Sequence, residues 1–347
     1  MPILTNAEQV RALLKKMQSA KIAVPCFCSE NTYTTEGILT GATKVAESLG
    51  LDSVPVYIAV TANYSGRQQL KNYTSLDSIE EGFLAFRSDL ERLARDDGPF
   101  PKVLVLPNLD HGQPDSDDFL FTGGKGFWAC VMYDCSKLPL EENRNRTAEF
   151  VKKYRKDYVI EGCVDEIYDR GQGPAGPMRL TQPEQAELFF RETNVDLIVA
   201  NLGTEHRATK ADLKYHSDLA RKITSIVGPR VVLHGTSSLS KNDLTSLRRD
   251  GIAKVNIWTI LETDLAQKML QFQIKDIGKV LSKEQIQSLV EQGWLGKKAL
   301  EHSKANNPSL GYMTEVYRRG KIKVPVVAEL VEEYFMVFGY GDLKSPA

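Results

Sequence analysis

Eight short apolar segments recur along this chain, and most are separated by stretches whose apolar residues repeat with helical spacing. The strand-like segments are residues 21–28, 54–60, 102–106, 127–133, 158–161, 196–201, 230–233 and 253–257. The main helical stretches are residues 34–50, 78–95, 141–155, 182–193, 210–227 and 240–250. Strands that alternate with helices pair in parallel, so the pattern predicts an α/β fold, a (β/α)8 TIM barrel. A doubly wound sheet is the alternative, because it shares the same alternation.

The chain is longer than such a barrel needs. A typical barrel takes about 250 residues, whereas this chain has 347 and its last strand-like segment ends at residue 257. We expect the barrel to occupy residues 1–275 and a C-terminal helical extension, packed on the barrel, to occupy residues 276–347. The clearest helices of that extension are residues 284–292 and 328–338.

Net charge and cysteine usage narrow the classes of partner and compartment. The 44 basic and 45 acidic residues give a formal charge of −1, which attracts neither nucleic acid nor an anionic membrane surface. No apolar run approaches the roughly 20 residues that span a bilayer, and the N-terminal residues lack a signal-peptide pattern. Five cysteines, an odd number, indicate reduced thiols in the cytoplasm, and the Cys26–Cys28 spacing is unsuited to a disulfide.

Three of the five histidines stand at the ends of strand-like segments: His111, His206 and His234. The carboxyl ends of barrel strands meet at one face, where the active sites of this fold lie. Three imidazoles there, with an open fourth position, are a ligand set of a catalytic zinc ion. The alternative is three unrelated loop histidines. His216 and His302 fall in helical patterns, and we expect them on the surface.

Acidic and small polar residues adjoin these histidines. Asp110 precedes His111 and is a candidate proton carrier beside a metal-bound substrate, or else a residue that orients a ligand. Asp134 ends another strand-like segment, and a structural role suits it equally. Residues 235–238 (Gly-Thr-Ser-Ser) and 256–259 (Asn-Ile-Trp-Thr) follow or end the last two segments, where barrels often bind phosphate. Only Gly235 provides the glycine that such a cradle favours, so an ordinary helix cap is the alternative.

Six segments in order carry a resemblance to a known family. They are residues 109–112 (Leu-Asp-His-Gly), 131–143, 181–186, 202–206 (Leu-Gly-Thr-Glu-His), 232–235 (Val-Leu-His-Gly) and 251–256. Together they resemble the class II fructose-bisphosphate aldolases, the zinc-dependent ketose-bisphosphate aldolase family, of which this chain looks like a divergent member. The resemblance implies that Asp110 is the acid/base acting on the aldehyde-derived oxygen. It implies zinc ligation by His111, His206 and His234 and substrate contacts by Asn256 and Thr259, and Lys210 matches a lysine of the family.

The chain departs from that family's pattern around the expected metal ligands. Arg207 follows the second histidine where the family has glycine, and Thr236 and Ser238 replace two further glycines. Fewer glycines imply fewer close backbone approaches to a phosphate, and Arg207 could instead bind an anion through its planar fork. Trp258 stands where the family has a carboxylate, which favours a smaller, flatter or less hydroxylated substrate.

A further departure follows the fifth strand-like segment. Residues 161–165 (Glu-Gly-Cys-Val-Asp) stand where the family has Glu-x-Glu-Leu-Gly. Cys163, at the place of the second glutamate, is either a fourth, soft zinc ligand or a small core residue. Whether Glu161 ligates the metal is open in the same way. Glu166, or Asp165 beside it, is our candidate second base.

We therefore expect a metal-dependent, aldolase-like aldehyde-lyase that cleaves or forms a C–C bond next to a carbonyl through a metal-stabilised enediolate. The expected cofactor is one Zn²⁺ per chain, with another divalent metal as the alternative. The substrate would be a small carbonyl compound, an anionic one included, but not fructose 1,6-bisphosphate. We expect no nucleic-acid or membrane partner, and a homo-oligomer, either a dimer or a tetramer. The expected catalytic residues are Asp110 and Glu166, and the expected substrate contacts are Arg207, Lys210, Gly235, Ser237, Asn256, Trp258 and Thr259.

Two other functions stay open on the sequence alone. The same metal site could serve an epimerase, a decarboxylase or an oxygen-using enzyme that acts on a carbonyl or carboxylate compound. Zinc is redox-inert, so an oxidative reaction would need another metal. A non-catalytic barrel homologue is the other alternative, and Asp110 speaks against it because a scaffold has no need of that acid.

Overall fold

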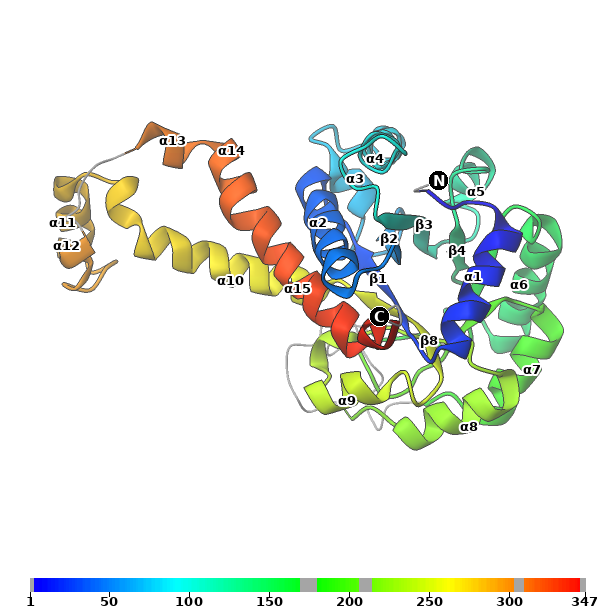
Figure 1. The fold of residues 1–347 in the computed structure, drawn as a ribbon. Helices are drawn as coiled ribbons and strands as arrows, with labels where there is room; N and C mark the ends of the chain where they lie inside the picture. Colours follow the sequence, from blue (N-terminus) through cyan, green and yellow to red (C-terminus); the bar gives the residue numbers. More distant parts are fainter. Residues whose placement is uncertain (1–2, 169–179, 206–213, 303–308, 344–347) are drawn as a thin grey trace.

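The computed structural model describes residues 3–168, 180–205, 214–302 and 309–343 and shows a closed barrel of eight parallel strands (Figure 1). Each strand pairs with the next along the chain, and the eighth pairs with the first. The strands are β1 (Val24–Cys28), β2 (Val54–Val60), β3 (Val103–Gly112), β4 (Cys130–Tyr133), β5 (Val159–Cys163), β6 (Leu197–Val199), β7 (Val231–Leu233) and β8 (Ile252–Ile257). The predicted TIM barrel is confirmed. The doubly wound alternative was wrong, because an open sheet has two edge strands, whereas here β8 pairs with β1 and closes the sheet.

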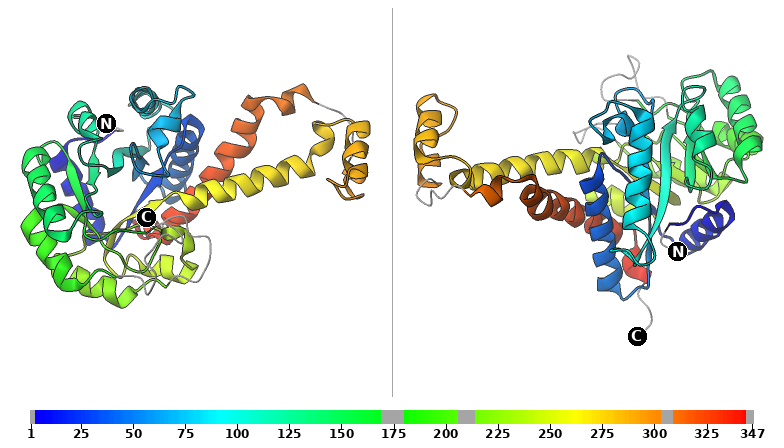
Figure 2. Two further views of the ribbon diagram at one scale, coloured as in Figure 1. Left: turned by 180° about the vertical axis from the view of Figure 1, so that it is seen from behind. Right: turned by 90° about the horizontal axis from the view of Figure 1, so that it is seen from above.

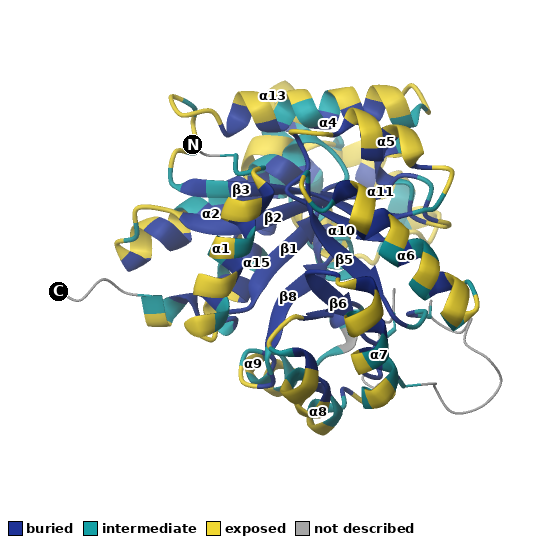
Figure 3. Ribbon diagram, turned by 90° about the vertical axis from the view of Figure 1, so that its right-hand side faces the viewer, coloured by how far each residue is buried: buried dark blue, intermediate teal, exposed yellow. Residues whose placement is uncertain are grey.

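Helices surround the barrel, most of them buried on one side and exposed on the other (Figure 3). They are α1 (Ala7–Ser19), α2 (Thr32–Leu49), α3 (Gln69–Tyr73), α4 (Ile79–Leu93), α5 (Asp118–Gly123), α6 (Leu140–Tyr154), α7 (Pro183–Thr193), α8 (Ser217–Val227) and α9 (Lys241–Ser246). Helix α4 begins where the Ser78 hydroxyl accepts a bond from the Glu81 amide, and Ser240 closes a capping box at α9. Pro183 opens α7, where its missing N–H costs nothing.

Sequence analysis missed some elements and misplaced others. It gave no helix for α1, α3 or α5, and it ended the third strand at residue 106, whereas β3 continues to Gly112. Helix α1 lies against the amino ends of two strands, because Arg11 on it donates to the Tyr158 carbonyl before β5 and to the Asp196 carboxylate before β6. All five cysteines are buried free thiols. No helix in the described part of the chain is long and apolar enough to cross a membrane.

The chain leaves the barrel after β8 and later returns to it. Helix α10 (Thr259–Lys275) runs outward, and α11 (Lys283–Glu291) and α12 (Ala299–His302) lie at its far end (Figures 1 and 2). Helices α13 (Leu310–Met313) and α14 (Glu315–Arg318) lead back toward α15 (Val324–Val337), which packs beside α2. We call residues 259–318 the arm. Within the predicted extension, α15 therefore packs on the barrel, whereas the arm projects from it, and the boundary at residue 275 stays a prediction.

The contact between α2 and α15 depends on two glycines one helical turn apart. A Cβ atom on Gly41 would lie 2.6 Å from the Ala328 carbonyl oxygen, and one on Gly37 would lie 2.6 Å from the Cβ of Val327. Such distances are well inside van der Waals contact, so only glycine lets the two helices approach this closely. The position at which α15 packs on the barrel is thus determined by two glycines of α2 that have no side chain.

We predict that Gly41→Ala destabilises the protein by about 1–3 kcal/mol, the usual cost of overpacking a core. At an open helical position the same change stabilises by about 0.5–1 kcal/mol, so the sign of the effect reports the close contact. Gly123→Ala in α5 is the matched control, because nothing lies within 4 Å of its added Cβ. Urea unfolding measures both variants, and a Gly41→Ala protein as stable as the wild type would contradict the prediction.

Candidate functional site

A β-bulge at the end of β3 brings two neighbouring residues to the mouth of the barrel. Leu109 pairs with Val131 and Gly112 with Tyr133, so β3 advances three residues while β4 advances two. Within the bulge, His111 adopts a left-handed backbone conformation with φ of 48°. Successive side chains on a regular strand point to opposite faces, and the extra residue of a bulge re-aims one of them. Asp110 and His111 can therefore serve the same site.

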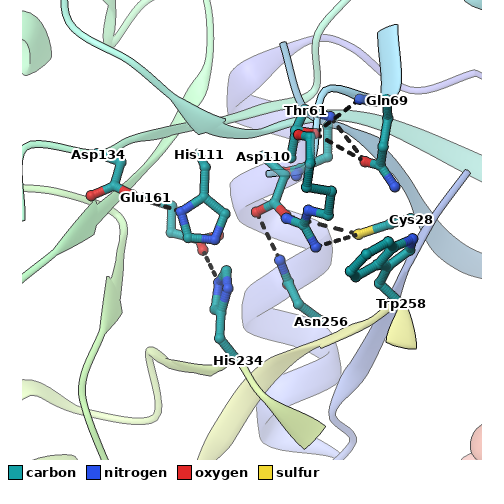
Figure 4. A network of polar contacts seen from close by, with 12 residues as sticks. Cys28, Thr61, Gln69, Asp110, His111, Asp134, Glu161, His234, Asn256 and Trp258 are labelled. Carbon is teal, nitrogen blue, oxygen red and sulfur yellow. Dashed lines mark hydrogen bonds and ion pairs between the residues drawn. The ribbon is translucent and has the colours of Figure 1, made fainter. Parts of the chain in front are cut away.

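The bulge and the end of β7 together form the candidate metal centre. One potential ligand atom from each of Asp110, His111 and His234 lies within 4.8 Å of the other two (Figure 4). The rings of the two histidines are 5.0 Å apart between centroids and nearly perpendicular, at 79°. The sequence placed Asp110 beside the ligands, and the structure places it close enough to be one of them. His206, the third expected ligand, lies outside the described residues.

Each of the two histidines in this group is held by a carboxylate. His111 Nδ1 lies 2.6 Å from Asp134 Oδ2, and His234 Nε2 lies 3.3 Å from Glu161 Oε1 (Figure 4). Burial would raise the pKa of Asp134, but hydrogen bonding from His111 and Ser136 lowers that pKa to about 2. Burial lowers the pKa of His234, which favours the neutral ring that binds metals. Carboxylates that orient ligating imidazoles are typical of metal sites, so these residues fit a divalent cation.

Cys163 is separate from this group. It is buried, its thiol donates to the Asp165 carbonyl at 3.1 Å, and burial raises its pKa well above the ordinary value. A protonated thiol turned to a carbonyl is a poor metal ligand, so the contact favours the core-residue alternative. Glu161 is also outside the group of three and contacts His234 instead.

A buried ion pair crosses the barrel interior beneath the histidines. Lys254 Nζ on β8 lies 2.7 Å from Glu161 Oε2 on β5 and 3.3 Å from Asn108 Oδ1 on β3, and the side chains of Lys254 and Glu161 are fully buried. Burial would raise the pKa of Glu161, but Lys254 and His234 hold it below its usual value. The sequence analysis gave Lys254 no role. The sequence signal that could have revealed this pair is a single charged residue inside each of two otherwise apolar strands, Glu161 in β5 and Lys254 in β8.

Arg67, which sequence reasoning also missed, contacts the candidate acid/base. Its Nη2 pairs with Asp110 Oδ2, while Asn256 Nδ2 donates to Asp110 Oδ1 at 2.9 Å. Burial would raise the pKa of Asp110, but His111 and Arg67 hold it well below its usual range, so the carboxylate is ionised. Arg67 lies in an ordinary polar loop after β2, and nothing in the sequence set it apart.

All five of the expected substrate contacts that the structure describes line one cavity. Its volume is about 20 Å³, room for about one water molecule. The Trp258 indole donates to Glu30 Oε1 at 2.5 Å, which fixes the ring beside the cavity. Gly235 has φ of 69°, and a Cβ there would lie 2.6 Å from the Glu205 carbonyl oxygen, so glycine is required. The cavity is lined by Arg67, His234, Gly235, Thr236, Ser237, Asn256, Ile257, Trp258 and Thr259.

Other sequence-based candidates lie elsewhere. Arg207 and Lys210 fall outside the described residues. Glu166 is in the loop after β5, where its backbone carbonyl accepts a bond from Asn201 Nδ2 at 3.2 Å, and it does not line the cavity. His216 precedes the first residue of α8 and is half-buried rather than fully on the surface. The side chain of His302 is outside the described part.

We predict that Lys254→Met lowers the free energy of unfolding by about 3–5 kcal/mol, because it leaves the Glu161 carboxylate buried without its cation. The double variant Lys254→Met/Glu161→Gln should recover part of that loss. Lys268→Met, which breaks a half-exposed pair with Asp264, should cost at most about 1 kcal/mol. Urea unfolding in chelator measures all three, and a double variant no more stable than the single one would refute the ion-pair account.

Comparison with known proteins identifies the family. The model of class II fructose-bisphosphate aldolases matches residues 8–318. The chain therefore belongs to the class II fructose-bisphosphate aldolase family, which confirms the resemblance carried by its motifs.

Individual relatives are more distant. A fructose-bisphosphate aldolase of Streptococcus pyogenes serotype M1 is 33% identical over 161 residues. A 6-phospho-5-dehydro-2-deoxy-D-gluconate aldolase of Shouchella clausii is 30% identical over 158 residues. Each alignment covers 45% of this chain and 53% of the relative, so the match spans about half the length of these curated relatives.

Two solved structures share the architecture over almost the whole chain. The fructose-bisphosphate aldolase of Campylobacter jejuni has a TM-score of 0.72 at 16% identity, covering 97% of this chain and 96% of its own. The YdjI aldolase of Escherichia coli K12 has a TM-score of 0.60 at 20% identity, covering 97% and 98%. At these identities the likeness establishes the fold alone.

Proposed function

We propose that this protein is a metal-dependent, aldolase-like lyase acting on a small carbonyl compound. The observation that carries the proposal is the group of Asp110, His111 and His234 at the carboxyl ends of the strands, with a carboxylate behind each imidazole. This combines two imidazole ligands with an ionised carboxylate at the place where barrel enzymes react. Membership of the aldolase family supports the same reaction class.

The metal would be held by His111 and His234, with His206 as the third ligand on sequence grounds. Zinc is the proposed ion, since imidazole and carboxylate ligands suit it and three protein ligands leave a position for substrate. A cation bound there would polarise the substrate carbonyl and stabilise the negative charge that the expected enediolate step places on its oxygen.

The surrounding residues would position the substrate and move its proton. Asp110, held ionised by Arg67 and oriented by Asn256, is in the form that accepts a proton. Glu166 is proposed as the second base, because the loop after β5 borders the same end of the barrel. Trp258 and Thr259 would form the wall against which the substrate lies.

The substrate is proposed to be a small carbonyl compound other than fructose 1,6-bisphosphate. The relatives are named for phosphorylated substrates, fructose bisphosphate and 6-phospho-5-dehydro-2-deoxy-D-gluconate. Here the cavity at the mouth has room for about one water molecule, with Arg67 and Trp258 in its wall. Trp258, which stands where the family has a carboxylate, presents an apolar ring there, and this favours a smaller or less hydroxylated substrate. Arg207, Lys210, Gly235 and Ser237 stay proposed contacts.

The deciding experiment measures metal content and aldol chemistry together. We expect one divalent metal per chain by elemental analysis, and loss of both metal and activity in His234→Ala. Asp110→Asn should keep the metal and lose about 10²–10⁴-fold in retro-aldol rate or in proton–deuterium exchange on a bound ketone. Exchange that continues in chelated protein would refute metal dependence. Loss of metal in Asp110→Asn would make Asp110 a ligand, and a glycolytic rate on fructose 1,6-bisphosphate would refute the substrate proposal.

We also propose that the protein is a homo-oligomer assembled through the arm. Five large apolar residues of the arm are each more than half exposed: Leu270, Ile274, Trp294, Leu310 and Val316. Monomeric proteins seldom expose so much apolar surface on one feature, and the arm stands clear of its own barrel (Figure 2). We propose that a second copy of the chain covers these residues.

The proposed compartment is the cytoplasm. The five buried free thiols fit it, because the cytoplasm keeps cysteines reduced.

We predict that the wild type has the mass of a dimer or tetramer by light scattering. The double variant Leu310→Glu/Val316→Glu should shift that mass toward the monomer, because burying two carboxylates in an apolar interface is costly. Leu84→Glu on α4 is the matched control, since this leucine is also more than half exposed but lies on the barrel instead of the arm. A monomeric wild type would refute the proposal.

A further inference from the structure

Arg67 reaches the mouth of the barrel from a loop, and its guanidinium lies over two aromatic rings. The guanidinium carbon is 5.6 Å from the centroid of the Tyr64 ring and 5.2 Å from that of Trp258. The residue is only 8% exposed, yet it lines the cavity beside His234 and Asn256. Aromatic faces hold a guanidinium in one plane and leave its N–H edge directed sideways.

The loop that carries Arg67 is tied down on both sides of this residue. The Thr61 hydroxyl donates to the Arg67 carbonyl, and the Thr61 amide donates to Gln69 Oε1 at 3.0 Å. Gln69 in turn donates to Glu30, the carboxylate that also receives the Trp258 indole. One hydrogen-bonded chain thus places both the arginine and one of its aromatic neighbours.

The hydrogen-bonding capacity of Arg67 is only partly used. Nη2 pairs with Asp110, and Nη1 lies 3.8 Å from the weak acceptor Cys28 Sγ. The adjacent Nε is buried and has no partner among the described residues, and the same is true of Asn256 Oδ1. Buried donors without acceptors are rare in folded proteins and call for an explanation. An arginine needed only to neutralise Asp110 would not require this fixed, half-used fork.

We propose that Arg67 is the subsite for an anionic group of the substrate, a carboxylate or a phosphate. The guanidinium fork matches two oxygens of either group, and its unused Nε would supply one of the two bonds. Asp110, which engages a single nitrogen, keeps its second bond from Asn256 when an anion arrives. The inference rests on the proposed function in one respect: the anion belongs to the carbonyl compound bound at this site.

The test compares matched ligands by calorimetry on the protein as purified, with its metal. Pyruvate carries a carboxylate, dihydroxyacetone phosphate carries a phosphate, and dihydroxyacetone carries neither. We expect at least one of the two anions to bind the wild type about tenfold or more tightly than dihydroxyacetone. Arg67→Lys, which keeps the charge but loses the fork, should weaken that anion about ten- to a hundredfold and dihydroxyacetone far less. Arg87→Lys, on the exposed face of α4, is the control.

The outcomes separate this inference from the proposed function. Selective loss for pyruvate or for dihydroxyacetone phosphate supports the subsite and names the anion, even if no aldol chemistry is found. An unchanged anion preference in Arg67→Lys overturns it. So does equal weakening of the neutral and charged ligands with a lower melting temperature, since Arg67 would then only hold the fold. Repeating the titration in chelated protein shows whether the preference survives without the metal, and its complete loss there overturns Arg67 as the receptor.

Discussion

The buried pair of Lys254 and Glu161 ties the barrel and its candidate site together. It joins β8 to β5 across the interior, and Glu161 extends the contact to His234 at the end of β7. Burying two charges is costly unless each finds a partner and good hydrogen bonds. The pair therefore fixes where these strands stand relative to one another, and it leaves one histidine oriented and uncharged at the mouth. The same interaction that constrains the core prepares the site above it.

The fold could be predicted from the sequence because its strands and helices have distinct local patterns of apolar residues. Strands of a parallel barrel are buried on both faces, so they appear as continuous apolar runs, and the runs at residues 54–60 and 253–257 lie within a residue of the observed bounds. The third strand failed the same test. Its second half contains Pro107, Asn108 and Asp110, and such residues are more typical of a loop than of a buried strand. The β-bulge that accommodates part of this segment cannot be predicted from the local sequence.

The candidate site was only partly accessible, because its contacts join residues far apart in the chain. His111 and His234 were found from their places at strand ends, and the structure brings them together. Arg67 was not found, since its role depends on Asp110 and Trp258, and no local pattern marks an arginine that meets distant partners. The arm shows the same limit. Periodicity located only α11 of its helices, as residues 284–292, and the exposure of apolar side chains on the arm is visible only in the folded chain.

Charge balance at the mouth links the metal and the anion subsite. Two of the buried carboxylates already have permanent cationic partners, Asp110 with Arg67 and Glu161 with Lys254. Asp134 contacts His111 and Ser136, so three carboxylates of this group face two permanent cations before a metal enters. A divalent cation would turn that deficit into an excess of positive charge in a water-poor cavity, where electrostatic interactions are strong. An anionic substrate restores neutrality, and Arg67 is the one described cation in the cavity wall with a donor still unused. Metal binding and anion recognition, as proposed, would therefore be coupled through the same buried charges, although they would use different side chains.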